Sequence, residues 1–358
     1  MRHSVHALES LCAGAEAMVV SLDAPRYDET QGNLRLLGVP LPAPLHPKEP
    51  ARLRYLRWAM RVVPLMRAFS TDARVDPNQR PSWGRLVLEE AILQRLPTLL
   101  VFANTLTMDR GRPPRILELA RDPVVHRVAN FRRIATDAMV ELGLPVEKAL
   151  AYAFPEGRSP ADYETKVLSP PPHSVLFAGR LIEEKGASDV IGAVRELRSR
   201  GRDVSLTILG QGPFEADLRQ LAKDAPKGLI TFAGQVPNTV MFDMLRRSTV
   251  AVVPTRPEFM EGMPMSLTEG LISRTPLVIS NHIVFTRSFR DREGVLIAEA
   301  KSPSSFASCI DELISNAELY STMSSATEAA YARVACDHTF EDVLMDWRAE
   351  TFPTHVRA

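Results

Sequence analysis

Cysteine is scarce in this chain. Three of its 358 residues are cysteines (Cys12, Cys309 and Cys336), and no two of them have CxxC spacing. This scarcity excludes a disulfide scaffold, argues against a cysteine zinc site and favours a reducing compartment. Long apolar runs are missing as well, since none approaches the roughly 20 residues that span a bilayer. The N-terminal "MRHSVHALES" lacks the apolar core of a signal peptide, so we expect a cytoplasmic protein.

The chain also has no excess charge of either sign. It carries 43 Lys and Arg against 43 Asp and Glu, which gives a formal net charge of zero. No global field therefore attracts nucleic acid, and we expect no nucleic-acid partner. A composition of 45% hydrophobic and 24% charged residues is typical of a soluble globular protein. The length is sufficient for two domains.

The second half of the chain alternates short apolar runs with amphipathic helical patterns. A period of strand, helix and strand predicts βαβ units around a parallel sheet. We therefore predict a Rossmann-like domain of about six strands. The predicted strands are 174–179, 204–210, 229–234, 250–255, 276–280 and 294–298, and the predicted helices are 187–200, 214–225, 239–248 and 265–273.

The first half is also α/β, with longer and more irregular loops. "EAMVVSLD" is typical of a strand, residues 84–104 of a helix, a proline break and a strand, and residues 128–144 end as a helix. The stretch "SPPPH" (169–173) is a stiff break, because consecutive prolines favour an extended chain and cannot continue a helix. We predict the linker there, with domains 1–169 and 170–339, followed by an amphipathic helix within 340–358.

Two cations follow the strand in "FAGRLIEEKG" (177–186). Ligands of open parallel sheets bind at the carboxyl ends of strands. Arg180 and Lys185 suit a diphosphate there, since arginine forms a bidentate fork and lysine adds a point charge. The alternative is a solvated loop in which Glu183 and Glu184 pair with these bases.

Two glycines follow the next predicted strand, and the strand after that is followed by a residue whose backbone groups could contact a ligand. Gly210 and Gly212 in "ILGQGP" would let a ligand approach the backbone, although a tight turn explains them as well. In "TFAGQVPN", the backbone of Val236 could offer a donor and an acceptor to the edge of a base. Each signal is weak when it stands alone.

Two carboxylates bracket a predicted helix start in "EFMEGMPMSLTEGL" (258–271). Pro264 suits the first helical position, and the free amides of a helix N-terminus form an anion site. Glu261 precedes that start and Glu269 lies about one turn beyond it. A carboxylate accepts hydrogen bonds well from vicinal hydroxyls of a sugar or ribose. The alternative is that these acids only offset the helix dipole.

Together, "GRLIEEKG", "ILGQGP", "FAGQV" and "EGMPMSLTEGL…TPLVIS" resemble the C-terminal domain of retaining GT-B glycosyltransferases of family 4, over about residues 174–335. The resemblance implies catalytic roles for Glu261 on the donor sugar and for Arg180 and Lys185 on the diphosphate. It implies that Glu269 holds the ribose. The further donor-binding residues that it implies are Gly210, Gln211, Val236, Gly262, Met263, Pro264 and Met265. It implies no metal ion and no other cofactor, and no Asp-x-Asp motif occurs in the sequence.

The resemblance also implies the GT-B architecture, in which two Rossmann-like domains face a central cleft. The first domain would hold the acceptor, and the terminal helix within 340–358 would cross back to it. The first half departs from the family pattern. Its first strand and glycine-rich loop are absent from the expected place, and "LLVFANTLTMD" has no histidine where the family tends to place one.

An amphipathic pattern at 51–69 points to a possible membrane contact. Arg54, Arg57 and Arg61 share one predicted helical face, and apolar residues share another. Such a helix can lie on an anionic membrane at the inner face of the cell membrane, which would suit a lipid-linked acceptor. The alternative is a surface helix that packs its apolar side on the domain.

The combined prediction is a retaining glycosyltransferase. It would move a hexose from a UDP- or GDP-sugar to a glycan or lipid-linked acceptor in cell-envelope or exopolysaccharide biosynthesis. Two alternatives remain open. The departures in the first half favour a non-catalytic nucleotide-sugar-binding partner, and a GT-B sugar-nucleotide epimerase fits the pair of glutamates less well.

Overall fold

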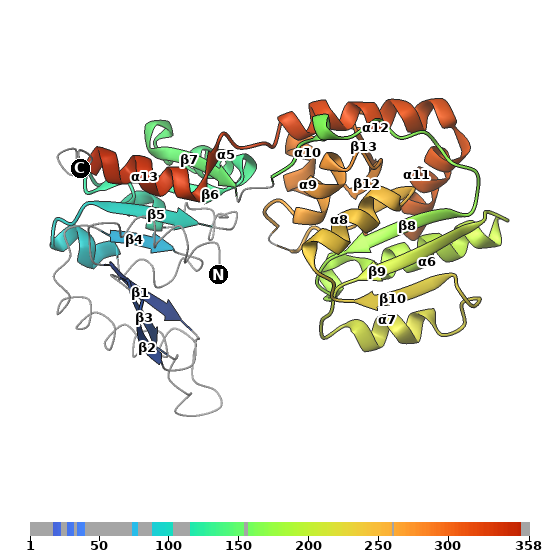
Figure 1. Cartoon of the computed structure of the whole chain (residues 1–358), viewed down its shortest axis with the longest axis horizontal. Coiled ribbons are helices and arrows are strands. Elements are labelled where there is room, and N and C mark those ends of the chain that lie inside the picture. The colour runs from blue at the N-terminus through green and yellow to red at the C-terminus, as the bar shows by residue number, and fades with distance from the viewer. Residues whose placement is uncertain are drawn as a thin grey trace. The chain divides into compact units, whose positions relative to one another are not determined.

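The computed structural model describes residues 17–22, 27–31, 34–39, 74–77, 88–102, 115–153, 157–259 and 261–351, with the backbone alone before residue 88. The chain divides into two units (Figure 1). The first unit combines Met1–Pro155 with Cys336–Ala358, and the second is Glu156–Ala335. Residues 1–16, 51–69 and 103–114 lie outside the described residues. The membrane helix, the missing first strand and glycine loop, and the missing histidine therefore stay predictions.

A six-stranded parallel sheet forms the centre of the second unit, in the order β10-β9-β8-β11-β12-β13. Its strands coincide closely with the six apolar runs of the sequence, which confirms the predicted Rossmann-like domain. The strand order reverses between β8 and β11, and such a reversal is the usual ligand position in this class of sheet. The strands are β8 (His173–Ala178), β9 (Val204–Leu209), β10 (Ile230–Gly234), β11 (Val250–Val253), β12 (Leu277–Ser280) and β13 (Val295–Ala298).

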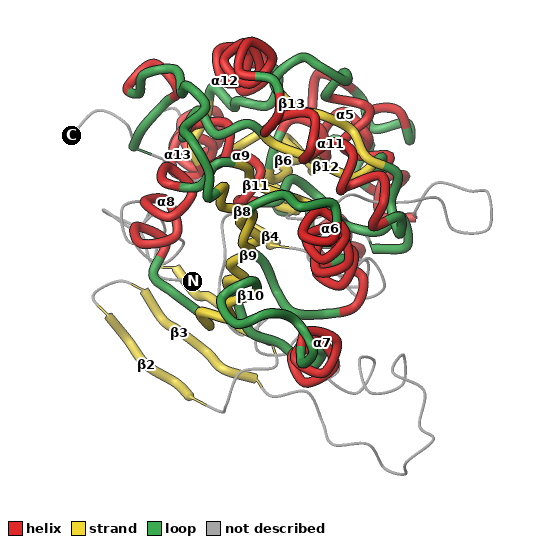
Figure 2. The backbone as a smooth tube through the Cα atoms, turned by 90° about the vertical axis from the view of Figure 1, so that its right-hand side faces the viewer, coloured by secondary structure: helices red, strands yellow, loops and turns green. Residues whose placement is uncertain are grey.

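Helices cover both faces of this sheet. Helices α6 and α11 lie on one side and α8 and α9 on the other (Figure 2). Helix α6 turns Val190, Ile191, Val194 and Leu197 inward, and all four are fully buried, as their helical spacing predicts. The helices are α6 (Ala187–Ser199), α7 (Glu215–Ala222), α8 (Asn238–Arg247), α9 (Met265–Ile272), α10 (Ile283–Ser288), α11 (Pro303–Ser315) and α12 (Ala317–Ala332).

The first unit contains a second parallel sheet, in the order β14-β7-β6-β5-β4. Its strands are β4 (Arg74–Pro77), β5 (Thr98–Phe102), β6 (Val125–Phe131), β7 (Ala149–Ala153) and β14 (His338–Thr339), and its helices include α4 (Arg115–Leu119) and α5 (Arg133–Glu141). A separate small sheet contains β1 (Ala17–Leu22), β2 (Tyr27–Gln31) and β3 (Leu34–Val39). The predicted α/β character of this half is confirmed.

The terminal helix α13 (Phe340–Thr351) belongs to the first unit, as predicted. It follows the second unit in sequence and packs its apolar face beside β5 and β7. Phe340, Val343 and Trp347 share a buried cluster with Leu99 and Tyr152. The chain therefore crosses back to its first unit.

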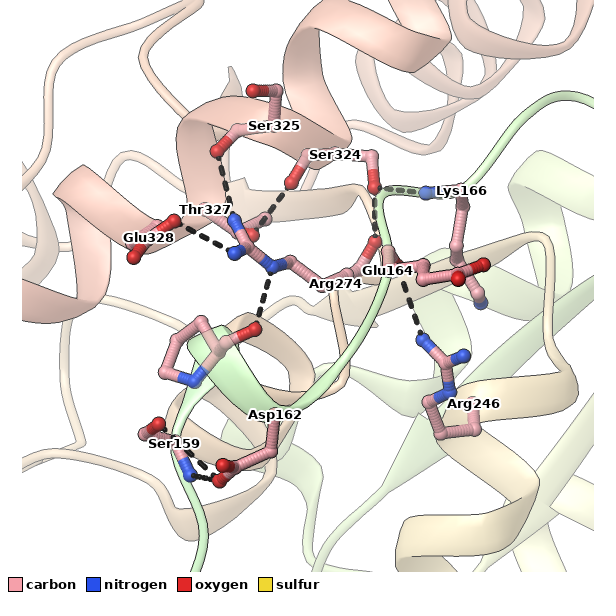
Figure 3. A network of polar contacts seen from close by, with 11 residues as sticks. Ser159, Asp162, Glu164, Lys166, Arg246, Arg274, Ser324, Ser325, Thr327 and Glu328 are labelled. Atoms are coloured by element: carbon pink, nitrogen blue, oxygen red, sulfur yellow. Dashed lines mark hydrogen bonds and ion pairs between the residues drawn. The ribbon is translucent and has the colours of Figure 1, made fainter.

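The change of unit does not fall at the predicted linker. It lies at residue 155/156, ahead of the predicted boundary at 169/170, and the return lies at 335/336. The reason is that the segment before the prolines is bonded to the second unit (Figure 3). Arg274 Nε donates to the Pro160 carbonyl at 2.8 Å, and the Lys166 amide donates to Ser324 Oγ at 2.8 Å. The prolines therefore lead into β8 within one unit.

No helix in the described part of the chain is long and apolar enough to cross a membrane.

Candidate functional site

The site is built on the two loops that leave the sheet where its strand order reverses. One loop runs from β8 to α6 and the other from β11 to α9. Arg256 of the second loop fastens them together. Its N–H donates to the Glu184 carbonyl at 2.8 Å, and its guanidinium donates to Asp189 and Glu183, each at 3.0 Å. These bonds place the two loops, and the side chains they carry, side by side.

Lys185 and Glu261 form a direct ion pair between these loops. The side chains are only 14% and 9% exposed. Thr255 Oγ1 also donates to Glu261 Oε2, at 3.1 Å. Removing one partner from such a shielded pair leaves a charge uncompensated, which is costly. Lys185 and Glu261 thus contact each other in this structure. The resemblance implied separate roles for them, Lys185 on the diphosphate and Glu261 on the sugar.

Phe259 brings the second predicted cation close to the first. The Lys185 ammonium lies 4.6 Å from the centroid of its ring, and the Arg180 guanidinium carbon lies 5.6 Å from it. Cations are attracted to the face of an aromatic ring at such distances. Arg180 is exposed, whereas Lys185 is half-buried. The ring thus holds two positive charges near one another beside Glu261.

His282, just after β12, holds Phe259 in place through the backbone of the loop. Its Nδ1 accepts from the Val284 amide at 3.2 Å, so its Nε2 carries the proton and donates to the Phe259 carbonyl at 2.9 Å. Burial is the main cause that lowers the pKa of His282 from its ordinary value of 6.5, and the nearby Lys185 lowers it further, while Glu261 and the bond to Phe259 oppose this. The imidazole is therefore neutral near pH 7.

Glu269 lies in the second turn of α9 and is buried. Asn238 Nδ2, at the start of α8, donates to Glu269 Oε1 at 3.0 Å, and an Arg158 nitrogen lies 3.6 Å from the same oxygen. Asn238 directly follows the loop after β10, which holds the half-buried Val236, so the predicted base contact and the predicted ribose contact are neighbours.

Helix α9 begins at Met265, as the predicted range 265–273 has it, whereas Pro264 is not its first helical residue. Pro264 precedes that residue as the N-cap. The Pro264 carbonyl accepts from the amides of Leu267 and Thr268 at 3.1 and 3.2 Å. Of the residues expected to offer amides, Gly262 is half-buried, Met263 is buried, and Met265 is exposed.

The glycines after β9 have a structural function. Gly210 has φ of 122°, and a Cβ there would lie 1.9 Å from the Gly179 carbonyl oxygen. A Cβ on Gly212 would lie 2.3 Å from the Leu181 carbonyl oxygen, and the Leu181 amide donates to the Gln211 carbonyl at 3.0 Å. These residues let the β9 loop pack directly against the β8 loop. A ligand is not needed to explain them.

The described residues contain no group of three or more His, Cys, Asp and Glu side chains that could hold a metal ion.

Residues 163–330 match a family model described as glycosyl transferases group 1. The matched residues are just under half of the chain, and over them the chain resembles that family. The match contains every residue of the site described above except Arg158. The matched region therefore includes the loops after β8, β10 and β11.

Curated relatives have the same kind of name. An alpha-D-kanosaminyltransferase of Streptomyces kanamyceticus is 29% identical over 153 residues, which are 42% of this chain and 38% of the relative. An amylovoran biosynthesis glycosyltransferase of Erwinia amylovora is 27% identical over 156 residues, again 42% of this chain and 38% of the relative. The chain thus matches about two fifths of the length of each.

Solved structures show the fold of the whole chain. A glycosyltransferase of Rickettsia africae aligns over 99% of this chain and 95% of its own, with a TM-score of 0.64 and 13% identity. The HepE protein of Anabaena, solved with UDP and glucose, covers 90% of this chain and 87% of its own, with a TM-score of 0.62 and 14% identity. The chain has the GT-B type of fold, with two α/β units.

Sequence reasoning named the charged residues of this candidate site and missed the residues that support them. Phe259, His282, Asn238 and Arg158 received no role from the sequence. His282 had a usable signal, because it follows the predicted strand 276–280 and therefore lies at the same edge of the sheet as the site loops. Phe259 and Arg158 lie in irregular loops, whose path the sequence does not specify.

Proposed function

We propose that this chain is a retaining glycosyltransferase that moves a hexose from a nucleotide-diphosphate sugar, with UDP or GDP as the nucleotide, to a glycan or lipid-linked acceptor. The observation that carries the proposal is the Lys185–Glu261 pair on the two loops at the reversal of the strand order. Nucleotides bind parallel α/β sheets at such a reversal. A pair of cations and a carboxylate at that point match a diphosphate that carries a sugar.

In this proposal, the donor rearranges the ion pair. Diphosphate oxygens take Lys185 and Arg180 as partners, and Glu261 turns to the hydroxyls of the sugar. The bond between the anomeric carbon and the phosphate oxygen then breaks, and its electron pair leaves with the nucleoside diphosphate. Cations fixed beside that oxygen stabilise the developing charge, which is the role a metal ion has in other transferases. The acceptor hydroxyl adds to the sugar, and its proton passes to the departing phosphate.

Glu269 is assigned to the nucleoside in this proposal. It accepts hydrogen bonds from the ribose hydroxyls, while the backbone of Val236 meets the base. Its position supports this role, since Asn238 connects it to the loop that holds Val236. The Anabaena protein, which was solved with UDP, supports a nucleotide as the ligand of this type of fold.

The names of the relatives support a pathway class. One relative is named for amylovoran biosynthesis, and another is named as a kanosaminyltransferase. We propose a place in cell-envelope or exopolysaccharide biosynthesis, where glycan and lipid-linked acceptors occur. The predicted amphipathic helix at 51–69 would then lie at the inner membrane surface.

The test is release of UDP or GDP from a panel of sugar nucleotides by the purified full chain, with and without acceptors. We expect one donor to be turned over and Lys185→Ala to reduce its turnover by roughly 100-fold or more, because a leaving-group contact is lost. The matched control is Lys301→Ala. Lys301 also pairs with a glutamate, Glu258, at 2.9 Å, but both side chains are about half exposed.

Three results would contradict the proposal. Turnover of Lys185→Ala at the wild-type rate would remove the assigned role of the pair. Tight donor binding by the wild type without hydrolysis or transfer to any acceptor would indicate the non-catalytic binding partner instead. Conversion of the donor sugar without an acceptor would indicate the epimerase.

A further inference from the structure

The segment at residues 157–168, near the start of the second unit, is fixed to the far end of the helix that carries Glu269. Arg274, shortly after the end of α9, donates to the Pro160 carbonyl at 2.8 Å and pairs with Glu328 at 2.7 Å. Lys166 Nζ donates to the Ser248 carbonyl at 2.6 Å. Figure 3 shows Arg274 directed at this segment from beside α12. The segment therefore has a defined path across the unit.

This path places Arg158 against the nucleoside side of the site. Its guanidinium carbon lies 3.6 Å from the centroid of the Phe242 ring on α8. One of its nitrogens lies 3.6 Å from Glu269 Oε1. The Arg158 side chain is 23% exposed and that of Glu269 is 5% exposed. An arginine that stacks on an aromatic ring loses little further entropy when it pairs with a carboxylate.

The distances separate the function of Arg158 from that of Asn238. Asn238 makes a hydrogen bond of 3.0 Å to Glu269 Oε1, whereas 3.6 Å is too long for a hydrogen bond. Arg158 therefore balances the charge of the buried carboxylate without donating a hydrogen bond to that oxygen. A nearby positive charge favours the ionised form of a buried carboxylate, and an ionised carboxylate is a stronger acceptor for hydroxyl groups.

We propose that Arg158 is a positioning residue that holds the Glu269 carboxylate in place for the ribose hydroxyls of the nucleoside diphosphate. The inference rests on the proposed donor site and deepens it, because it names a residue that strengthens the preference for a ribose over a 2′,3′-dideoxyribose. Arg158 acts through Glu269, so its effect on affinity requires the ribose hydroxyls that donate hydrogen bonds to Glu269.

The experiment measures, by calorimetry on the full chain, the affinities for UDP and for 2′,3′-dideoxy-UDP, with GDP and its dideoxy analogue if the wild type prefers guanine. We expect the wild type to bind the ribonucleotide about tenfold more tightly or better. Arg158→Met should weaken ribonucleotide binding by about tenfold and dideoxynucleotide binding by less than about twofold. Arg158→Lys keeps the positive charge and loses the planar guanidinium. Its affinity for the ribonucleotide should lie between those of the wild type and Arg158→Met.

The matched control is Arg219→Met. Arg219 also lies over a phenylalanine ring, Phe232 at 4.5 Å, and bonds to a glutamate, Glu215 at 2.8 Å, but it stands on the exposed side of α7. It should leave both affinities unchanged. Thermal melting of each variant shows whether it is folded at the temperature of the titration.

Equal losses for both nucleotides in Arg158→Met would overturn the inference, because Arg158 would then act on the diphosphate or the base. An unchanged ribonucleotide affinity in Arg158→Met would overturn it as well. Either result leaves the proposed donor site in place. A wild type that binds none of the nucleotides overturns the proposed function and this inference together.

Discussion

Glu261 and Glu269 are two carboxylates of one short segment, with seven residues between them, yet their surroundings differ in kind. Glu261 contacts the ammonium of Lys185 and the hydroxyl of Thr255, which come from loops at the reversal of the strand order. Glu269 contacts the amide of Asn238 and lies beside the guanidinium of Arg158, which is stacked on a ring.

The difference concerns what each carboxylate must do when a donor binds. A diphosphate competes with Glu261 for Lys185, so the Glu261 side has to exchange partners during the reaction. Asn238 is uncharged and Arg158 is held by stacking, so these two partners of Glu269 need not move. We expect the contact of Glu261 with the reacting sugar to strengthen in the transition state and so to affect kcat, whereas contacts of Glu269 that are equal in the bound ground state and the transition state affect KM.

The largest effect is expected from paired substitutions of the two carboxylates. Glu261→Gln should lower kcat by roughly 100-fold or more, because the hydroxyls of the reacting sugar lose a charged hydrogen-bond acceptor in the transition state. Glu269→Gln should raise the KM for the donor by about tenfold and change kcat by less than about threefold. Initial rates at varied donor and saturating acceptor give both constants. Glu258→Gln, on the same loop, serves as the control, and similar kinetic profiles for the two site variants would break the comparison.

A smaller effect is expected from the ring beneath the two cations. Phe259→Leu removes the aromatic face near Lys185 and Arg180 and should lower kcat/KM by about tenfold, in line with a cation–π loss of about 1 to 2 kcal/mol. Phe232→Leu removes the comparable ring beneath Arg219, which has no assigned role in the site, and should have no kinetic effect. A normal kcat/KM in Phe259→Leu would show that the cations do not need the ring.

Lowering the pH should destabilise the fold through His282, the residue that bonds to the Phe259 backbone beside Glu261. Burial holds the pKa of folded His282 below its ordinary value of 6.5, so below about pH 6.5 the unfolded chain takes up a proton that the folded chain does not. The contribution of His282 to the free energy of unfolding should be fully present above that pH. Below it, the free energy of unfolding should fall by at most about 1.4 kcal/mol per pH unit. Urea unfolding at pH 7.5 and 5.5 measures this loss. His282→Gln should show a smaller loss than the wild type, and an equal loss would assign the dependence to other groups.

The smallest effect is expected from chelation. In the proposed reaction, Arg180 and Lys185 stabilise the leaving diphosphate, so EDTA should change turnover by less than about twofold. A loss that added Mg²⁺ or Mn²⁺ restores would contradict this assignment.

Much of the second unit was predictable from the sequence because its strands are continuous apolar runs. "VAVV" is buried at every position, and every residue of "SVLFAG" and "VSLTIL" is buried or half-buried, so these runs can be recognised by their apolar composition. The charged site residues followed from strand ends, since parallel strands bring those ends to one edge. Arg180, Lys185 and Glu261 were placed in this way.

The remaining features depend on how loops pack, which periodicity does not encode. The direct contact between Lys185 and Glu261 follows from the bonds of Arg256 that tie their loops together. Gly210 has the sequence pattern of a ligand-binding glycine, and in the structure it also allows one loop to approach another. The prolines at 170–172 marked a break in secondary structure, whereas the domain boundary is set by the earlier contacts of Pro160 and Lys166.

The most direct test of the central claim is a crystal structure of the full chain with the nucleotide sugar, or its nucleoside diphosphate, that calorimetry selects. The account predicts diphosphate oxygens within about 3 Å of Lys185 Nζ, with the Lys185–Glu261 pair opened, and the ribose at Glu269. A nucleotide bound elsewhere, with the pair of Lys185 and Glu261 intact, would contradict it.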